Sequence, residues 1–202
     1  MRGMYMGALS HFDLNKYNAD IFIETGTYEA GSLLYAMNYH FQAYYSCEIN
    51  KFLYDVCVSK FVGIPHVKIY NCDSLAFLNK ILPDIPKEKS IVYWLDAHLP
   101  GAYSEQGILA DKFSSEDTIE NEINFPVTHE INIIYKYRKN CKDTILIDDL
   151  RTLIPLDREE VEKMGLFLNY SGLGFLDCFR SSHSIKEDHF DQGYLEIIPK
   201  EL

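Results

Sequence analysis

The stretch between residues 20 and 40, DIFIETGTYEAGSLLYAMNYH, decides how this chain is expected to fold. Its first part, IFIET at 21–25, is a run of apolar and β-forming residues that predicts a buried strand. In the turn that follows, Gly26 can take a positive φ, and Gly31 can let a helix start close to the strand. Residues 31–41 then have helical spacing. A strand, a tight turn and a helix in this order often form a nucleotide-binding place.

The same alternation of strands and helices continues along the chain. Further strands are predicted at 43–49, 66–72, 90–96 and 143–149, and further helices at 51–61 and 74–82. Five strands with helices between them predict an α/β fold, a doubly wound Rossmann-like sheet that is mostly parallel. After Arg151 the pattern changes, and GFLDCFRSSHS (174–184) and GYLEIIPK (193–200) predict a C-terminal antiparallel strand pair.

The length and rhythm of the chain favour one domain. Its 202 residues, 47% of them hydrophobic, can build one good core, so we expect a single domain over 1–202. Residues 1–19 are expected to be an N-terminal helical extension. The segment 97–125 has little periodicity and is long for a connection inside a compact domain, which is typical of a substrate-covering or lid loop.

Composition limits the partners and the compartment. The net charge of −11 argues against a broad nucleic-acid-binding face. No apolar run approaches the roughly 20 residues that a membrane span needs. The five cysteines include no CxxC pair, which disfavours a disulfide framework or a zinc ribbon. We expect a cytoplasmic protein with a small-molecule substrate and no nucleic-acid or membrane partner. The oligomeric state is left open, with a homodimer as one option.

Acidic residues follow the second and third predicted strands. Glu48 comes 22 residues after Gly26, where an acid can accept both hydroxyls of a ribose. The alternative is a solvated acid at a strand end. Asp73, in NCDS at 71–74, can face the amine of an adenine that lies across the strand tips. It can also cap the following helix, and both roles can hold at once.

These three pieces, in this order, resemble the class I S-adenosylmethionine-dependent methyltransferases. ETGTYEAGS is similar to their glycine-turn motif, CEI to their ribose-binding acid and NCDS to their adenine-contacting motif. The resemblance covers roughly residues 20–150. Where many members have Gly-x-Gly, this chain has Thr25-Gly26-Thr27. The likeness is closest to a methyltransferase-like subgroup that shares the WLDAH and LIDD strands.

The resemblance implies S-adenosylmethionine as the cofactor. Glu24 can accept from the ammonium of its methionine end, directly or through water, and this acidic turn would repel a pyrophosphate. The residues implied to bind the cofactor are Glu24, Thr25, Gly26, Thr27, Gly31, Ser32, Glu48, Asp73, Ser74 and Asp96.

A further acidic set points to a metal ion. Asp96 ends one strand and Asp148 and Asp149 end another, and the carboxyl ends of parallel strands meet in one crevice. Converging carboxylates repel unless they share a cation or a proton, and all-oxygen ligands suit Mg²⁺ or Ca²⁺. The set resembles that of metal-dependent O-methyltransferases of the catechol, cephamycin-hydroxylase-like and macrolide-sugar types. The alternative is that Asp149 is a cap or turn residue and Asp96 lines the cofactor pocket.

The predicted catalytic residues are His98 and Asp96. His98 lies two residues past Asp96 and can act as general base, because imidazole titrates near neutral pH. It can equally be a metal ligand or an ordinary loop residue. Glu130, in FPVTHEINII, resembles a Glu after a Pro in the methyltransferase-like subgroup. Its role is left open, and a helix-surface residue is the default interpretation.

The leading hypothesis is therefore a metal-assisted O-methyltransferase that uses S-adenosylmethionine and acts on a small polar acceptor, such as a sugar or a glycan precursor. One alternative keeps the fold and changes the reaction, to another nucleoside cofactor or to metal-dependent hydrolysis, because a fold does not imply a function. Another is a non-catalytic binding module.

Overall fold

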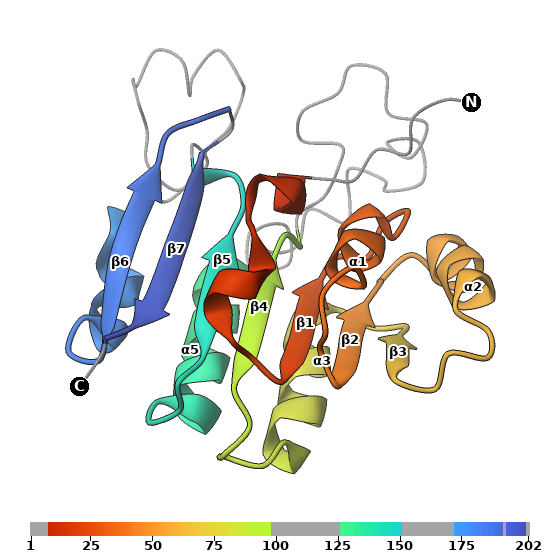
Figure 1. The fold of residues 1–202 in the computed structure, drawn as a ribbon, viewed down its shortest axis with the longest axis horizontal. Helices are drawn as coiled ribbons and strands as arrows, with labels where there is room; N and C mark the ends of the chain where they lie inside the picture. Colours follow the sequence, from red (N-terminus) through yellow and green to blue (C-terminus); the bar gives the residue numbers. More distant parts are fainter. Residues whose placement is uncertain (1–7, 98–125, 151–171, 192, 201–202) are drawn as a thin grey trace, which may run out of the picture.

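A computed structural model describes residues 8–97, 126–150, 172–191 and 193–200, and Figure 1 shows the fold. The strands of these residues form one sheet in the order β3-β2-β1-β4-β5-β7-β6. Neighbouring strands from β3 to β5 in this order are parallel, whereas β7 runs antiparallel to both β5 and β6. The strands are β1 (Ile21–Thr25), β2 (Ala43–Cys47), β3 (Val67–Tyr70), β4 (Ile91–Leu95), β5 (Thr144–Ile147), β6 (His183–Asp188) and β7 (Tyr194–Pro199). The predicted Rossmann-like sheet is confirmed.

Helices cover both faces of the sheet (Figure 1). One face packs against α3 (Ser74–Ile81), α5 (Val127–Arg138) and the 3₁₀ helix η6 (Gly172–Phe179). The other packs against α1 (Gly31–Ala36), α2 (Lys51–Lys60) and the 3₁₀ turns η1 (Ala8–His11) and η2 (Leu14–Tyr17). A third 3₁₀ turn, η3 (Leu82–Asp84), follows α3. Among the helices described, none combines the length and the apolar character that crossing a membrane requires.

The burial of β1 explains why its sequence is almost continuously apolar. All five of its side chains are buried, because parallel strands in such sheets are covered on both faces. Ile21 and Ile23 belong to the core on the α3 and α5 side, and Phe22 belongs to the core on the α1 side. Since side chains alternate along a strand, Glu24 lies on the α1 side and Thr25 on the α3 and α5 side.

Two predicted boundaries are wrong. The helix predicted over 31–41 ends at Ala36. The expected N-terminal helical extension contains, over the part described, the two 3₁₀ turns η1 and η2. The second predicted C-terminal strand is confirmed as β7. Its partner β6 lies at 183–188, so it shares only His183 and Ser184 with the strand predicted over 174–184 and continues into the polar residues that follow.

The position of β6 at the sheet edge explains this last difference. Among the described strands it pairs with β7 alone, and exposed polar residues are the usual choice on an edge strand. The apolar residues just before it form η6 instead, and Leu176 and Phe179 of η6 are buried in the core beside α5. Length and composition alone did not distinguish that short helix from a strand.

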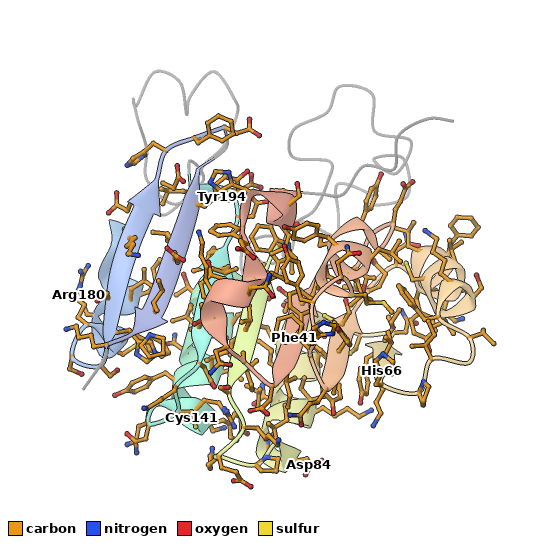
Figure 2. The ribbon with its side chains drawn as sticks, viewed as in Figure 1. Phe41, His66, Asp84, Cys141, Arg180 and Tyr194 are labelled. Atoms are coloured by element: carbon orange, nitrogen blue, oxygen red, sulfur yellow. The ribbon has the colours of Figure 1, made fainter. Side chains whose placement is uncertain are left out.

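The segment before β1 is fastened to β7 by aromatic rings near the carboxyl edge of the sheet. Phe12 packs edge-on against Trp94 and Tyr194, with ring centroids 6.0 and 5.4 Å apart. His11 stacks on Tyr194 at 4.8 Å, and His11 Nε2 lies 2.9 Å from Asp188 Oδ2. Figure 2 shows Tyr194 at this junction. The segment before β1 therefore packs against the start of β7 beside β4.

A buried ion pair fixes the opposite, amino edge of the sheet, which Asp84 and Cys141 mark in Figure 2. Arg138, at the end of α5, donates from Nε and a terminal nitrogen to the two oxygens of Asp143, at 2.8 and 2.9 Å. Asp143 also accepts the backbone N–H of Ile91 at the start of β4. Arg138 further donates to the carbonyls of Ile85, Pro86 and Lys89. One guanidinium thus ties α5 to the start of β4 and the approach to β5.

We predict that Arg138→Ala lowers the free energy of unfolding by about 3–5 kcal/mol, because it leaves the buried carboxylate of Asp143 without its partner. Denaturant unfolding followed by circular dichroism measures this. Arg180→Ala is the matched control, since Arg180 pairs with Asp177 while both side chains are exposed. Equal losses in the two variants would contradict the role assigned to the buried pair.

Candidate functional site

The residues that follow four parallel strands form a row at the carboxyl edge of the sheet. In the strand register, Thr25 pairs with both Cys47 and Leu95, and Leu95 pairs with Ile147. The next residues along the row are Glu48, Gly26, Asp96 and Asp148. The chain passes from β1 to β2 on one side, while β4 lies on the other. The strand order therefore reverses between β1 and β4, which is where open α/β sheets bind ligands.

The turn after β1 has an unusual backbone. Gly26, Tyr28 and Ala30 have φ values of 85°, 46° and 64°. Residues other than glycine rarely adopt positive φ, and doing so costs roughly 1–3 kcal/mol. At Gly26 a side chain is also excluded by space, because a Cβ would lie 2.8 Å from the carbonyl oxygen of Asp96 and 3.2 Å from Cα of Ala97. The turn thus fits closely against the chain that leaves β4.

The first amides of the turn bind the neighbouring strand. The N–H groups of Gly26 and Thr27 both donate to the carbonyl of Cys47, at 3.2 and 2.9 Å. The Thr27 hydroxyl is 2.6 Å from the Ser46 hydroxyl and donates to the same carbonyl at 3.0 Å. Gly26 and Thr27 therefore fasten the turn to β2, and their amides are already engaged.

Glu24 is the most unusual side chain of the site. It is fully buried, with 0% of its surface exposed. Its Oε2 accepts from the Ser46 hydroxyl at 2.8 Å, but its Oε1 has no hydrogen-bond partner among the described residues. Burial raises the pKa of Glu24 to about 8, and the charges of Asp96 and Glu48 add to this, while the hydroxyls of Ser46 and Ser32 act against it. This buried oxygen is suited to a donor that the described residues do not supply.

Glu48 is held by the turn itself. Its Oε2 accepts the N–H of Tyr28 and its Oε1 accepts the N–H of Asn50, each at 2.8 Å. Burial raises its pKa, against the effect of these backbone bonds. An ionised carboxylate has about four acceptor sites, so two remain for the hydroxyls of a ribose. The ribose contact stays a prediction.

Asp73 takes the capping role that its position allowed. Its Oδ1 accepts the N–H of Ala76 at 2.7 Å and caps α3. Ser74, the first residue of α3, is buried. The expected contact of Asp73 with an adenine is untested by this geometry.

The predicted cofactor residues gather on two faces of the end of β1. On the α1 side, the Ser32 hydroxyl lies close enough to act on Glu24, and Gly31 begins the six-residue helix α1. On the α3 and α5 side, the hydroxyls of Thr25 and Ser74 act together on one buried carboxyl, that of Glu130. Two polar clusters, one around Glu24 and one around Glu130, therefore lie on opposite faces of the sheet beneath its carboxyl edge.

The structure does not support the predicted metal site. Within residues 8–97, 126–150, 172–191 and 193–200, no group of three or more His, Cys, Asp or Glu side chains could hold a metal ion. Asp148 Oδ1 accepts the backbone N–H of Asp149 at 2.8 Å, and Asp149 has a left-handed backbone with φ 56°. Asp96 Oδ2 accepts from the indole of Trp94 at 3.3 Å. Asp96, Asp148 and Asp149 thus reach neighbouring strand ends, but at least two of their carboxylates serve local contacts. Mg²⁺ or Ca²⁺ binding by these three side chains is not supported.

Two other predictions lie beyond the residues described. His98, the predicted base, falls outside them, as does the predicted substrate loop except for its first residue, Ala97. Their roles stay predictions.

Glu130 was wrongly interpreted as a surface residue. It is 1% exposed, and neither of its carboxylate oxygens has a hydrogen-bond partner. Burial raises the pKa of Glu130 to about 7, against the effect of the hydroxyls of Ser74 and Thr25. The sequence carries a signal that could have revealed this. Glu130, Ile134 and Arg138 are spaced by four residues and line the buried stripe of one helix.

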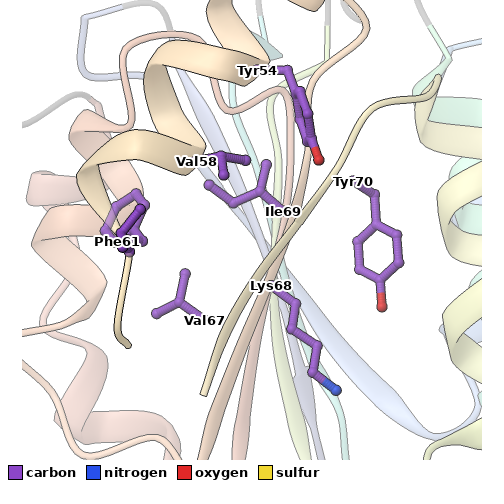
Figure 3. Close-up of a pocket in the computed structure, with 8 residues that line it drawn as sticks. Tyr54, Val58, Phe61, Val67, Lys68, Ile69 and Tyr70 are labelled. Atoms are coloured by element: carbon purple, nitrogen blue, oxygen red, sulfur yellow. The ribbon is translucent and has the colours of Figure 1, made fainter. Parts of the chain in front are cut away.

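A separate hollow lies away from this site. Figure 3 shows a cavity of about 400 Å³ at the edge strand β3, where Val67 and Ile69 face Val58 of α2 while Lys68 and Tyr70 point to the other side of the strand. None of the predicted site residues lines it.

Comparisons with known proteins establish the fold. No protein-family model and no curated protein matches this sequence. An O-methyltransferase from Bacillus cereus, solved in complex with S-adenosylhomocysteine (SAH), aligns over 93% of this chain and 77% of its own, with a TM-score of 0.57 at 11% identity. The N-methyltransferase NodS from Bradyrhizobium japonicum aligns over 97% and 94%, with a TM-score of 0.51 at 10% identity. Spermidine synthase from Thermotoga maritima aligns over 97% and 59%, with a TM-score of 0.51 at 11% identity. The chain thus has the Rossmann-like fold of class I methyltransferases.

We predict that Gly26→Ala destabilises the protein far more than Gly63→Ala. Both glycines have a φ near 80°, so an alanine at either position destabilises the backbone by about 1 kcal/mol. Only at Gly26 does the new methyl group also meet the Asp96 carbonyl, whereas nothing lies within 4 Å at Gly63. Denaturant unfolding should show an additional loss of about 1–3 kcal/mol for Gly26→Ala. Equal losses would mean that the close approach to β4 is not a constraint.

We also predict that Glu24 makes stability fall as pH rises. The folded state holds a proton on Glu24 up to about pH 8, whereas the unfolded chain releases it near 4.5. The stabilisation is therefore complete below about pH 4.5 and is lost progressively up to pH 8. Glu24→Gln removes this dependence, so the variant should match the wild type near pH 5 and exceed it by a few kcal/mol at pH 8.5.

Urea unfolding across pH 5 to 8.5 measures this difference. Glu29→Gln is the matched control, because Glu29 is an exposed acid of the same turn and its substitution should leave the pH profile unchanged. Parallel profiles for the wild type and Glu24→Gln would refute the assignment.

Proposed function

We propose that this protein is an S-adenosylmethionine-dependent methyltransferase that acts on a hydroxyl oxygen. The observation that carries the proposal is the unpartnered Oε1 of the buried Glu24, placed at the switch point of a class I methyltransferase fold. Leaving a buried acceptor without a donor costs about 1–3 kcal/mol. A bound ammonium group would repay that cost, and the methionine end of this cofactor carries one.

The residues at the strand ends fit the parts of such a cofactor in chain order. Glu24 would accept from the ammonium, Glu48 would accept from the ribose hydroxyls, and the start of α3 at Ser74 would lie beside the base. The bound cofactor supplies an electrophilic methyl group on a positively charged sulfur. The chain's task is to align that methyl with the acceptor oxygen, and alignment can contribute much of the rate.

The acceptor is proposed to be a small polar molecule, such as a sugar or a glycan precursor. Structures of this fold include both O- and N-methyltransferases, so the fold does not select the acceptor atom. The net charge of −11 disfavours a nucleic-acid acceptor. Asp96 borders the site next to Gly26, where its carboxylate could orient a hydroxyl. His98 remains the proposed base. No metal is part of the proposal, because the described carboxylates do not form a group that fits one.

The proposal predicts that SAH stabilises the protein and that NAD does not. At a hundredfold excess over its Kd, a ligand adds about 2.7 kcal/mol, which is roughly 5–10 °C in Tm for a domain of this size. Differential scanning fluorimetry with each ligand measures the shift. Stabilisation by NAD, or no shift with SAH near saturation, would favour another nucleoside ligand or a binding role.

Glu24→Gln should weaken SAH binding about tenfold or more, because the ammonium loses a charged acceptor. Isothermal titration calorimetry at pH 8.5 compares this variant with Glu29→Gln, in which an exposed acid of the same turn is neutralised and affinity should hold. If the two variants bind alike, Glu24 does not receive the ammonium.

A further inference from the structure

Glu130 is a second buried carboxyl group without a partner. Neither of its oxygens accepts a hydrogen bond from a described residue, and 1% of the residue is exposed. The same helix shows what a structurally satisfied buried charge looks like in this protein, since Arg138 bonds both oxygens of Asp143 and three carbonyls. Glu130, two turns earlier, has no comparable arrangement.

The surroundings of Glu130 place it beneath the candidate site. It lies in the first turn of α5, and its carboxyl group is close to the hydroxyls of Thr25, the last residue of β1, and Ser74, the first residue of α3. The Thr25 hydroxyl also accepts the N–H of Asp96 at 3.4 Å. Glu130 therefore faces the end of β1 from the side opposite to Glu24.

The position beside α3 indicates which part of a ligand Glu130 would meet. Along the sheet, the turn after β1 suits the amino-acid end and Glu48 suits the ribose. The base then falls toward the start of α3, where Ser74 and Glu130 meet. Asp73 was expected to bind the base there, but its Oδ1 is engaged by the N–H of Ala76. Among the described residues, the carboxyl of Glu130 is a buried acceptor in this region that has no hydrogen-bond donor.

We propose that Glu130 accepts a hydrogen bond from the exocyclic amine of the adenine of the bound cofactor. This inference rests on the proposed function. It assigns the two buried acids to the two ends of one ligand: Glu24 to the ammonium and Glu130 to the base amine. Thr25 and Ser74 would then orient the Glu130 carboxyl from below.

Calorimetry with two ligands tests this. One is SAH, and the other is its 6-deaminated purine analogue, which lacks only the exocyclic amine. The wild type should bind SAH at least tenfold more tightly than the analogue. In Glu130→Leu, which removes the acceptor, SAH should bind as weakly as the analogue, so that their ratio falls to about one. Glu130→Gln keeps a neutral acceptor, and its ratio should be intermediate. Glu88→Gln, an exposed acid at the amino edge, should retain the wild-type ratio.

The outcomes separate this inference from the proposed function. If the wild type binds neither ligand, the proposed function fails. Suppose instead that the wild type binds SAH, and that Glu130→Leu keeps the wild-type ratio of the affinities for SAH and for the analogue. The inference is then overturned. It is also overturned if Glu130→Leu weakens the binding of both ligands equally, because Glu130 then only supports the fold. If Glu130→Leu does not fold, the ratio in Glu130→Gln decides: a value equal to the wild type overturns the inference and a reduced value supports it.

Discussion

The close approach between the turn after β1 and the chain that leaves β4 is the constraint on which the rest of the site depends. A Cβ at Gly26 would lie 2.8 Å from the carbonyl of Asp96, so the two segments meet with no room for a side chain. The turn can follow this path only with positive φ at Gly26, Tyr28 and Ala30. Hydrogen bonds from the turn to Cys47 and Glu48 hold it there. Backbone strain maintained in this way by its surroundings is typical of functional sites.

Among the described residues, buried acidic side chains have hydrogen-bond partners at the amino edge of the sheet, but at the carboxyl edge some of their oxygens have none. At the amino edge, Asp143 is buried against Arg138 and fully bonded, which serves the fold. At the carboxyl edge, Glu24 and Glu130 are buried on opposite sides of β1 with oxygens that lack donors. Burial raises the pKa of both carboxyl groups, to about 8 for Glu24 and about 7 for Glu130, so the fold can hold them in the protonated form. A ligand that donates to these oxygens would favour their ionised form, and its binding would release protons.

The sequence predicted the sheet well because strand burial leaves a strong mark. IFIET and SIVYWLD are nearly continuous apolar runs, as parallel strands covered on both faces require. The row of acids after β2, β4 and β5 followed from the same pattern. The metal site predicted from that row is not supported among the described residues, because sharing one sheet edge does not by itself make carboxylates converge. Asp148 instead bonds the backbone of Asp149. Glu130 was missed because a single acid in a polar helix start looks solvent-exposed, and only its four-residue spacing from Ile134 and Arg138 indicates burial.

The hydrogen bonds of the turn after β1 also indicate which kind of nucleotide it can bind. In dinucleotide-binding proteins, the turn after the first strand presents backbone N–H groups to a pyrophosphate. Here the N–H groups of Gly26 and Thr27 donate to Cys47, and that of Tyr28 donates to Glu48. These three N–H groups are therefore already engaged within the chain and would not bind a pyrophosphate as those of a dinucleotide-binding turn do. Beside them, one buried oxygen of Glu24 has no hydrogen-bond partner among the described residues.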